Sequence, residues 1–310
     1  MRARGRLEWG GVLALACATG CTQRAALPAV DPVRLHARVV HQVAQGPRVP
    51  GTPGHAAVRD WIAAELARLG ARVERQPFVD STLGRPVSLE NLIGHFEAAG
   101  GGPGERHVVL AAHFDTRPVA DMDTVAENRS QPIPGANDGA SGVAVLLEVA
   151  ELLAEHRAPI RVDLVFFDGE DLGRPSEPET YSLGARGYAA RLVAPLPIAA
   201  FVFDMVGDRD LQIHPEAYSS ERAASLVALV AEAAQATGST GFKPGVRYRV
   251  TDDHLPLLDA GIPAVDIIDF DYPAWHTLAD TPDQVSGASL AQVARVAAWI
   301  VYASSLARPR

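Results

Sequence analysis

The sequence has almost no cysteine. Of its 310 residues only Cys17 and Cys21 are cysteines, and both lie near the N-terminus. The chain beyond them therefore cannot form an internal disulfide, a thiolate metal site or a thiolate nucleophile. A chain of this length can bury a sufficient hydrophobic core without disulfides.

The sequence also lacks a run of lysine and arginine, and its formal net charge is -9. Removing residues 1–20 takes away three arginines and one glutamate, a net charge of +2, which leaves -11. An acidic chain without a basic segment argues against nucleic acid as a partner.

A long hydrophobic run is missing as well. Trp9 to Ala18 is apolar but too short to span a bilayer, and it follows a segment that contains three arginines. This pattern is typical of an export signal, which we predict to be residues 1–20. The small residues before Cys21 resemble the cleavage box of bacterial lipoproteins. A lipidated Cys21 with a tether over 21–34 would place the protein in the cell envelope or periplasm, whereas ordinary cleavage would release it as a secreted protein.

No internal repeat or low-complexity tract interrupts the rest of the chain. From residue 107 onwards, strand-like and helix-like segments alternate, which predicts a mainly parallel sheet covered by helices on both faces. We therefore expect one α/β domain over 35–310. We expect strands at 73–79, 87–96 (the first two antiparallel), 107–112, 162–167, 198–203 and 264–268, and helices at 31–45, 55–69, 143–153, 220–236, 255–260 and 289–306.

The stretch RVDLVFFDGED at 161–171 combines a strand-like run with a cluster of carboxylates. A nearly continuous apolar run ends directly in Asp168, Glu170 and Asp171. Ligands of open α/β sheets bind beyond the carboxyl ends of the strands, and carboxylates this close together repel one another unless a cation or shared protons compensate. The stretch therefore predicts a metal site.

Further polar residues occur where strands end or helices begin: His113, Asp115, Asp138, Asp204, Asp252 to His254, and His276. Histidine and carboxylate ligands without cysteine are typical of an open, catalytic zinc site. Asp115 could accept a hydrogen bond from the His113 imidazole without binding the metal itself, and so fix which ring nitrogen carries the proton. The adjacent Glu170 and Asp171 allow one carboxylate to bind metal while the other carries protons.

The chain resembles a known family, the glutaminyl-peptide cyclotransferases (glutaminyl cyclases). The resemblance covers about residues 35–305 and rests on HFD, GANDGASG, FFDGED, YSLGARGYAARL, FDMVGD, DDHLPLLDAGIP and WHT, in this order. That family shares its fold with the co-catalytic zinc aminopeptidases.

The resemblance implies roles for individual residues. It implies zinc ligands at Asp138, Asp171 and His276, and an acid/base carboxylate at Glu170. It implies supporting acids at Asp204 and Asp252, and a substrate-binding tryptophan at Trp275. If a second zinc binds, the resemblance implies that His113 and Asp204 hold it, with Asp138 bridging the two ions. The chain departs from the family at Asp171, where Glu is usual, and at Asp266, where the animal enzymes have His.

Each residue also has a simpler interpretation. Asp138, Asp252 or Asp253 could cap the helix that follows, and Glu170 and Asp171 could form a solvated turn. His276 could be an exposed loop histidine, Trp275 could be loop packing, and His254 could be structural. Seven other histidines lack a supporting pattern and are expected at the surface or in structural roles: His36, His41, His55, His95, His107, His156 and His214.

Three functions are consistent with these residues. In the first, one zinc and Glu170 convert the N-terminal glutamine of a peptide or protein to pyroglutamate and release ammonia. In the second, a dinuclear zinc aminopeptidase uses Glu170 to take a proton from water. In the third, the chain is a metal-free binding lipoprotein on the same scaffold.

Overall fold

The computed structural model describes residues 27–101 and 106–307. The predicted signal, Cys21 and the first part of the predicted tether, residues 21–26, lie outside these residues and stay predictions. Among the described residues, no helix has the length and apolar character needed to cross a bilayer.

Six strands form one mixed sheet in the order β1-β2-β4-β3-β5-β6. They are β1 (Arg72–Asp80), β2 (Val87–Phe96), β3 (His107–His113), β4 (Arg161–Phe167), β5 (Ala199–Asp204) and β6 (Ala264–Ile268). The last four are parallel, while β1 and β2 pair antiparallel and join the sheet through β4. The predicted fold class is confirmed, including the early antiparallel pair.

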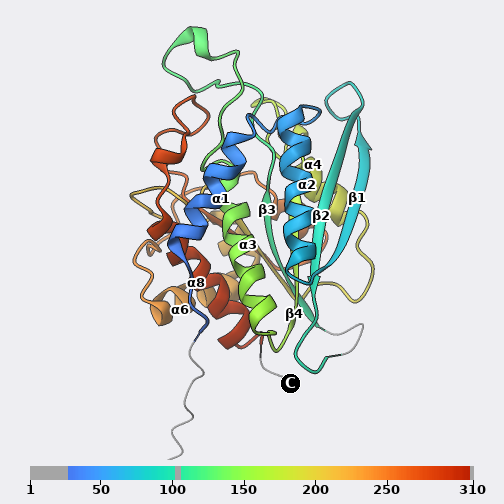
Figure 1. The fold of residues 1–310 in the computed structure, drawn as a ribbon, viewed down its shortest axis with the longest axis vertical. Helices are drawn as coiled ribbons and strands as arrows, with labels where there is room; N and C mark the ends of the chain where they lie inside the picture. The colour runs from blue at the N-terminus through green and yellow to red at the C-terminus, as the bar shows by residue number, and fades with distance from the viewer. Residues whose placement is uncertain (1–26, 102–105, 308–310) are drawn as a thin grey trace, which may run out of the picture.

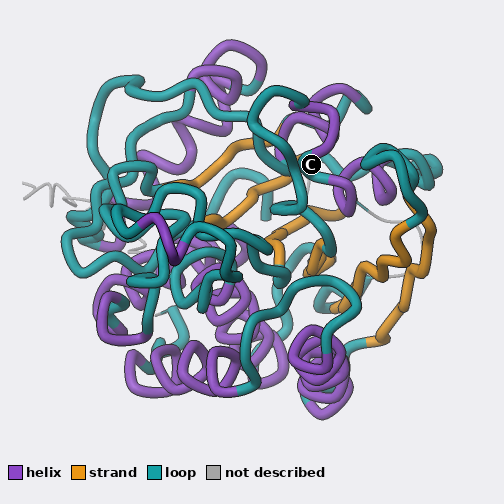
Figure 2. The backbone as a smooth tube through the Cα atoms, turned by 90° about the horizontal axis from the view of Figure 1, so that it is seen from above, coloured by secondary structure: helices purple, strands orange, loops and turns teal. Residues whose placement is uncertain are grey.

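Helices cover both faces of the sheet (Figures 1 and 2). One face carries α1 (Pro32–Ala44), α2 (Pro53–Arg68), α3 (Ala140–Glu155), α6 (Ala224–Thr237) and α8 (Gly287–Ala303), and the other carries α4 (Leu183–Ala189), α5 (Ala217–Arg222) and α7 (His254–Asp259). The strands β3, β4 and β5 are almost fully buried between the two layers. Their carboxyl ends are therefore held rigidly at one edge.

The folded unit begins before residue 35. The Asp31 side chain caps α1 by accepting from the backbone N–H groups of Val33 and Arg34. Arg34 and Arg38 both donate to the Glu148 carboxylate, which is buried on α3. The end of the predicted tether thus belongs to the first helix.

The predicted helix at 220–236 is two helices. Glu216 starts α5 at Ala217 by accepting from the N–H groups of Tyr218 and Ser219, and the chain breaks at Ala223, whose φ is -140°. The alanine-rich sequence contains no residue that signals this break. The cause is tertiary, because α5 packs on β6 and α7 whereas α6 packs on α8.

Asp168 braces the turn after β4 and belongs to no group of candidate metal ligands among the described residues. Its carboxylate accepts from Nε2 of His55 at 2.7 Å and from the backbone N–H of Glu90 at 2.7 Å, and its own N–H donates to Asn91. His55 is buried and structural. Gly169 follows with a φ of 76°, a conformation that a side chain disfavours, and turns the chain toward Glu170.

We predict that Asp168→Ala lowers the free energy of unfolding by about 2–4 kcal/mol, because it leaves a buried imidazole and a backbone N–H without an acceptor. Urea denaturation followed by circular dichroism measures the change. Glu179→Ala, which removes an exposed carboxylate, is the matched control and should change stability little. Equal stability of the two variants would refute the bracing role.

Candidate functional site

The predicted polar residues meet at the carboxyl edge of the sheet. His113 ends β3, Glu170 and Asp171 follow β4, and Asp204 ends β5. Asp138 lies just before α3, and His276 comes from the loop that precedes α8. Residues from five separate segments therefore meet at one place.

Asp138, Asp171 and His276 form the first group, with one ligand atom of each within 4.8 Å of the others. Nε2 of His276 lies 3.7 Å from Asp138 Oδ2 and 3.5 Å from Asp171 Oδ1. On the opposite side of the ring, Nδ1 lies 3.2 Å from Asp121 Oδ1. With the Nδ1 proton directed at Asp121, the Nε2 lone pair faces two carboxylates, an arrangement that calls for a cation.

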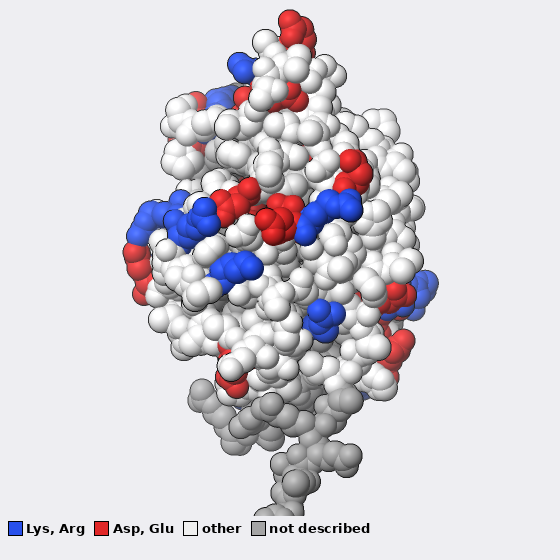
Figure 3. Space-filling model, turned by 90° about the vertical axis from the view of Figure 1, so that its left-hand side faces the viewer, with Lys and Arg blue, Asp and Glu red and all other residues white. Residues whose placement is uncertain are grey.

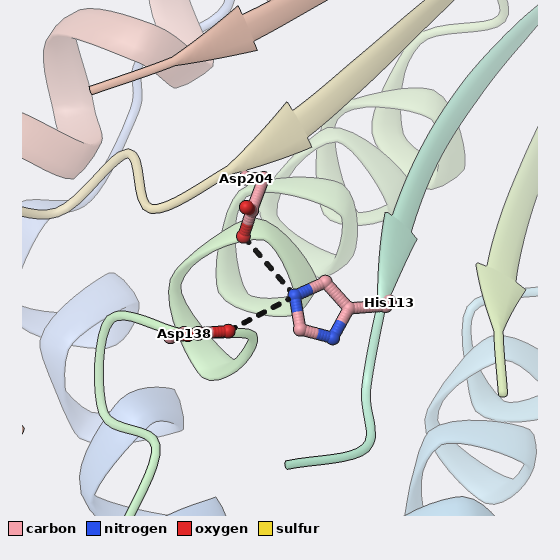
Figure 4. Close-up of side chains that lie close together, drawn as sticks. All are labelled: His113, Asp138 and Asp204. Carbon is pink, nitrogen blue, oxygen red and sulfur yellow. Dashed lines mark hydrogen bonds and ion pairs between the residues drawn. The ribbon is translucent and has the colours of Figure 1, made fainter. Parts of the chain in front are cut away.

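His113, Asp138 and Asp204 form a second group that shares Asp138 with the first (Figure 4). Nε2 of His113 is 3.1 Å from Asp204 Oδ1 and 3.3 Å from Asp138 Oδ1. Gly139 lies against this ring, since a Cβ atom there would be 2.5 Å from its Cε1. The described residues thus offer two adjacent metal-ligand sets with a common carboxylate.

Asp115 has a second task beside the predicted one. Its Oδ1 atom lies 3.6 Å from Nδ1 of His113, so the carboxylate faces the imidazole as an ion pair. In addition, its two oxygens accept from the backbone N–H groups of Glu170 and Asp171 at 3.1 and 3.2 Å. It therefore fixes the direction of both following carboxylates, which a sequence spacing of 55 residues does not reveal.

Glu170 is buried beside the first group. Burial, followed by repulsion from Asp171 and Asp252, raises its pKa well above the ordinary value of 4.5. The backbone N–H of Ser182 donates to its carbonyl oxygen at 3.0 Å. A carboxyl group in such surroundings is suited to take up and release a proton near neutral pH.

Asp252 does not cap α7, and neither does Asp253, since no side-chain cap hydrogen bond forms at that helix start. Burial and the nearby Asp204 raise the pKa of Asp252 to about 6. His254 lies completely buried behind it, 3.2 Å from Glu216 Oε2 and 3.6 Å from Asp266 Oδ2. Asp252 therefore faces the pocket, whereas His254 packs behind it.

The two ligand groups open into a pocket of about 340 Å³. Trp275 lines it and is half-buried, with its ring 4.9 Å from that of Phe270 and 4.0 Å from the His276 ring, centroid to centroid. The tryptophan thus forms an aromatic wall directly beside the first ligand group, rather than only packing its own loop.

Sequence reasoning missed Arg117 and Asp121, which lie in a segment that reads only as a polar loop. Arg117 is buried and donates to Asp171 Oδ1 at 3.0 Å and to both oxygens of Asp121 at 2.8 and 2.7 Å. It also missed Asp280, which accepts from the N–H groups of Asn137 and Asp138. No sequence motif marks these residues, because each acts through a distant part of the chain.

The donor set fits a divalent cation such as zinc. Each group offers an imidazole nitrogen and carboxylate oxygens. The Oδ2 atom of Asp171 is buried without a hydrogen-bond partner among the described residues.

Three non-glycine residues of the described chain have positive φ, and each adjoins the site: Ser182, Met205 and His276. Backbone strain of this kind gathers at functional sites.

Comparison with known proteins agrees with this geometry. Residues 91–301 match Peptidase family M28. The glutaminyl-peptide cyclotransferase-like protein of Bos taurus is 28% identical over 285 residues, which cover 81% of this chain and 70% of that protein.

Solved structures are similar over most of the chain. The glutaminyl cyclase of Bacteroides thetaiotaomicron, bound to N-acetylhistamine, has a TM-score of 0.86 and 32% identity, covering 90% of this chain and 100% of the other. A Zn-dependent exopeptidase from Parabacteroides distasonis has a TM-score of 0.85 and 31% identity, also covering 90% and 100%. The predicted resemblance to the glutaminyl cyclases and to the zinc peptidase fold is confirmed. Since the family match spans more than half of its residues, the chain belongs to peptidase family M28.

Proposed function

We propose that the protein is a zinc-dependent glutaminyl-peptide cyclotransferase. One observation carries the proposal: the buried carboxyl group of Glu170, with its raised pKa, adjoins the Asp138, Asp171 and His276 group inside a pocket walled by Trp275. Glutaminyl cyclases among the relatives and the solved structures support it.

Asp138, Asp171 and His276 would hold the zinc ion. When bound, zinc supplies a Lewis acid that polarises the side-chain amide carbonyl of the substrate glutamine. Asp121 would keep the His276 ring oriented by accepting from Nδ1, and Arg117 would hold both Asp121 and Asp171 in place. The buried chain residues thus fix the ligands before the substrate arrives.

Glu170 would move the proton. The α-amine nitrogen of the substrate forms a bond to the Cδ carbon of its own side chain, and Glu170 accepts the proton that the amine loses. Glu170 then returns that proton to the amide nitrogen as the C–N bond breaks, so that ammonia leaves. The nearby Asp252 raises the pKa of Glu170 and would therefore favour its protonated form, and Asp204 in turn raises the pKa of Asp252. Because both reacting groups belong to one glutamine residue, proximity supplies much of the rate.

A second function, a dinuclear zinc aminopeptidase, rests on the second ligand group. His113 and Asp204, together with Asp138, would hold another zinc ion. Glu170 would then take its proton from water rather than from an amine. The Zn-dependent exopeptidase of Parabacteroides distasonis supports this alternative.

Zinc counting combined with two assays separates these functions. Residues 22–310 would be purified, their zinc content measured by elemental analysis, and a peptide with N-terminal glutamine assayed beside aminoacyl anilides. One zinc ion per chain with ammonia release supports the cyclotransferase. Two ions with anilide cleavage and no ammonia overturns it, and a chain that binds no zinc points to a binding protein.

We predict that Glu170→Gln retains zinc but lowers kcat by at least about 100-fold, because the amide cannot accept the amine proton. Ammonia release and zinc content are measured on the same preparation. Glu155→Gln, at the exposed end of α3, is the control and should keep full activity. A Glu170→Gln variant with normal turnover would remove Glu170 from the reaction.

We predict that Asp121→Ala weakens zinc binding by roughly 10–100-fold, because His276 loses the acceptor that orients its ring. Chelator competition measures the affinity. Asp121→Asn, which keeps an oxygen acceptor for Nδ1 but not the charge, should lie between the alanine variant and the wild type. The exposed Asp283→Ala serves as control, and unchanged affinity in Asp121→Ala would contradict the orienting role.

We also propose that the protein is exported and lipidated on Cys21, because an arginine-containing segment, a short apolar run and small residues precede this cysteine. Mass spectrometry of the mature N-terminus tests the proposal. A free N-terminus without lipid would indicate secretion instead, and an intact Met1 would exclude export by this route.

A further inference from the structure

The rim of the pocket carries an arginine that the reaction does not use. Arg249 lines the pocket together with Val250, Thr251 and Asp252, yet its side chain is about half exposed. Its guanidinium carbon lies 4.4 Å from the centre of the Tyr218 ring, and it forms an ion pair with the exposed Glu221. Stacking on an aromatic face holds a guanidinium in one orientation.

The backbone that carries Arg249 is also fixed. The buried Glu216 carboxylate accepts from the N–H groups of Val250 and Tyr218, at 3.2 and 2.8 Å. The N–H of Ala217 donates to the carbonyl of Tyr248 at 2.8 Å. Arg249 and the ring on which it stacks are therefore tied to the same carboxylate, which preorganises the guanidinium at the rim.

Charge in the pocket is arranged in two zones. Its lining includes six carboxylates, Asp121, Asp138, Glu170, Asp171, Asp204 and Asp252. Arg117, the other arginine of the lining, is buried and already paired with Asp121 and Asp171. The carboxylates suit the α-amine end of a peptide, whereas Arg249 offers an accessible guanidinium whose existing partner, an exposed carboxylate, is held weakly.

We propose that Arg249 is a specificity-determining residue that recognises a carboxylate on the substrate, a few residues after its N-terminal glutamine. This inference rests on the proposed function and adds a substrate class to it. The carboxylate would displace Glu221 and pair with the guanidinium, which presents its donors as a fork. An acidic side chain and the C-terminal carboxylate of a short peptide offer the same chemistry.

Two pairs of peptides distinguish these sources. Gln-Glu-Ala-Ala-amide is compared with Gln-Gln-Ala-Ala-amide, and Gln-Ala as the free acid is compared with Gln-Ala-amide. We expect kcat/KM to favour the carboxylate by roughly 3- to 10-fold in at least one pair, and the preference to shrink at high salt. The pair that shows it identifies the source of the carboxylate. Equal rates within both pairs overturn the proposal.

Three variants test the residue itself. Arg249→Ala should abolish the preference, while Glu221→Gln, which frees the guanidinium, should enlarge it. Arg247→Ala is the matched control, since Arg247 stacks on Tyr248 and pairs with Asp271 in the same way but does not line the pocket. A preference that survives Arg249→Ala, or is lost equally in Arg247→Ala, overturns the assignment.

A binding measurement separates this proposal from the proposed reaction. Calorimetry of the same peptides with zinc-loaded Glu170→Gln, and with Glu170→Gln combined with Arg249→Ala, reports Kd without turnover. A carboxylate-dependent Kd that disappears with Arg249 supports the subsite even if no peptide is cyclised. Kd values that do not depend on the carboxylate refute the subsite, whether or not ammonia is released.

Discussion

Repulsion between buried carboxylates is the constraint on which this structure depends. Five of them, Asp138, Glu170, Asp171, Asp204 and Asp252, line one pocket together with the half-buried Asp121, and like charges this close together repel one another. Positively charged side chains and backbone N–H groups compensate part of this repulsion. Arg117 pairs with Asp171, Asp115 accepts two backbone N–H groups, and Asp280 accepts two more just before α3. Even so, Asp171 Oδ2 stays buried without a hydrogen-bond partner among the described residues, and Asp138 and Asp171 both face Nε2 of His276, which is where a cation belongs.

The same constraint explains which residues of the site could be predicted from the sequence and which could not. Apolar strands that end in carboxylates mark the edge of a sheet, so the fold class and the gathering of Asp138, Glu170, Asp171 and His276 were predictable from local patterns and the family resemblance. The compensating partners were not predictable in the same way. Arg117 and Asp121 act across more than fifty residues of chain, and their segment has no periodicity or motif that would single them out.

Contacts between distant segments account for what local patterns do not predict. Asp115 faces its neighbour in sequence, His113, but the turn after β4 also directs two backbone N–H groups at its oxygens. The break at Ala223 follows from the need of α5 and α6 to pack on different elements, although their sequence favours one continuous helix. Local propensity decided what each segment can form, and tertiary packing decided where it stops.

The Glu216 carboxylate makes the pocket rim sensitive to acid. Burial alone would raise its pKa, but Nε2 of His254 and the N–H groups of Ser219 and Tyr218 outweigh burial and lower the pKa from 4.5 to about 2. A depressed carboxyl pKa stabilises the folded state above the unfolded value of 4.5, and that stabilisation is lost as the pH falls toward 2. In strong acid the Glu216 carboxylate would be protonated, and the hydrogen bonds by which it ties α5 to the segment carrying Arg249 would weaken.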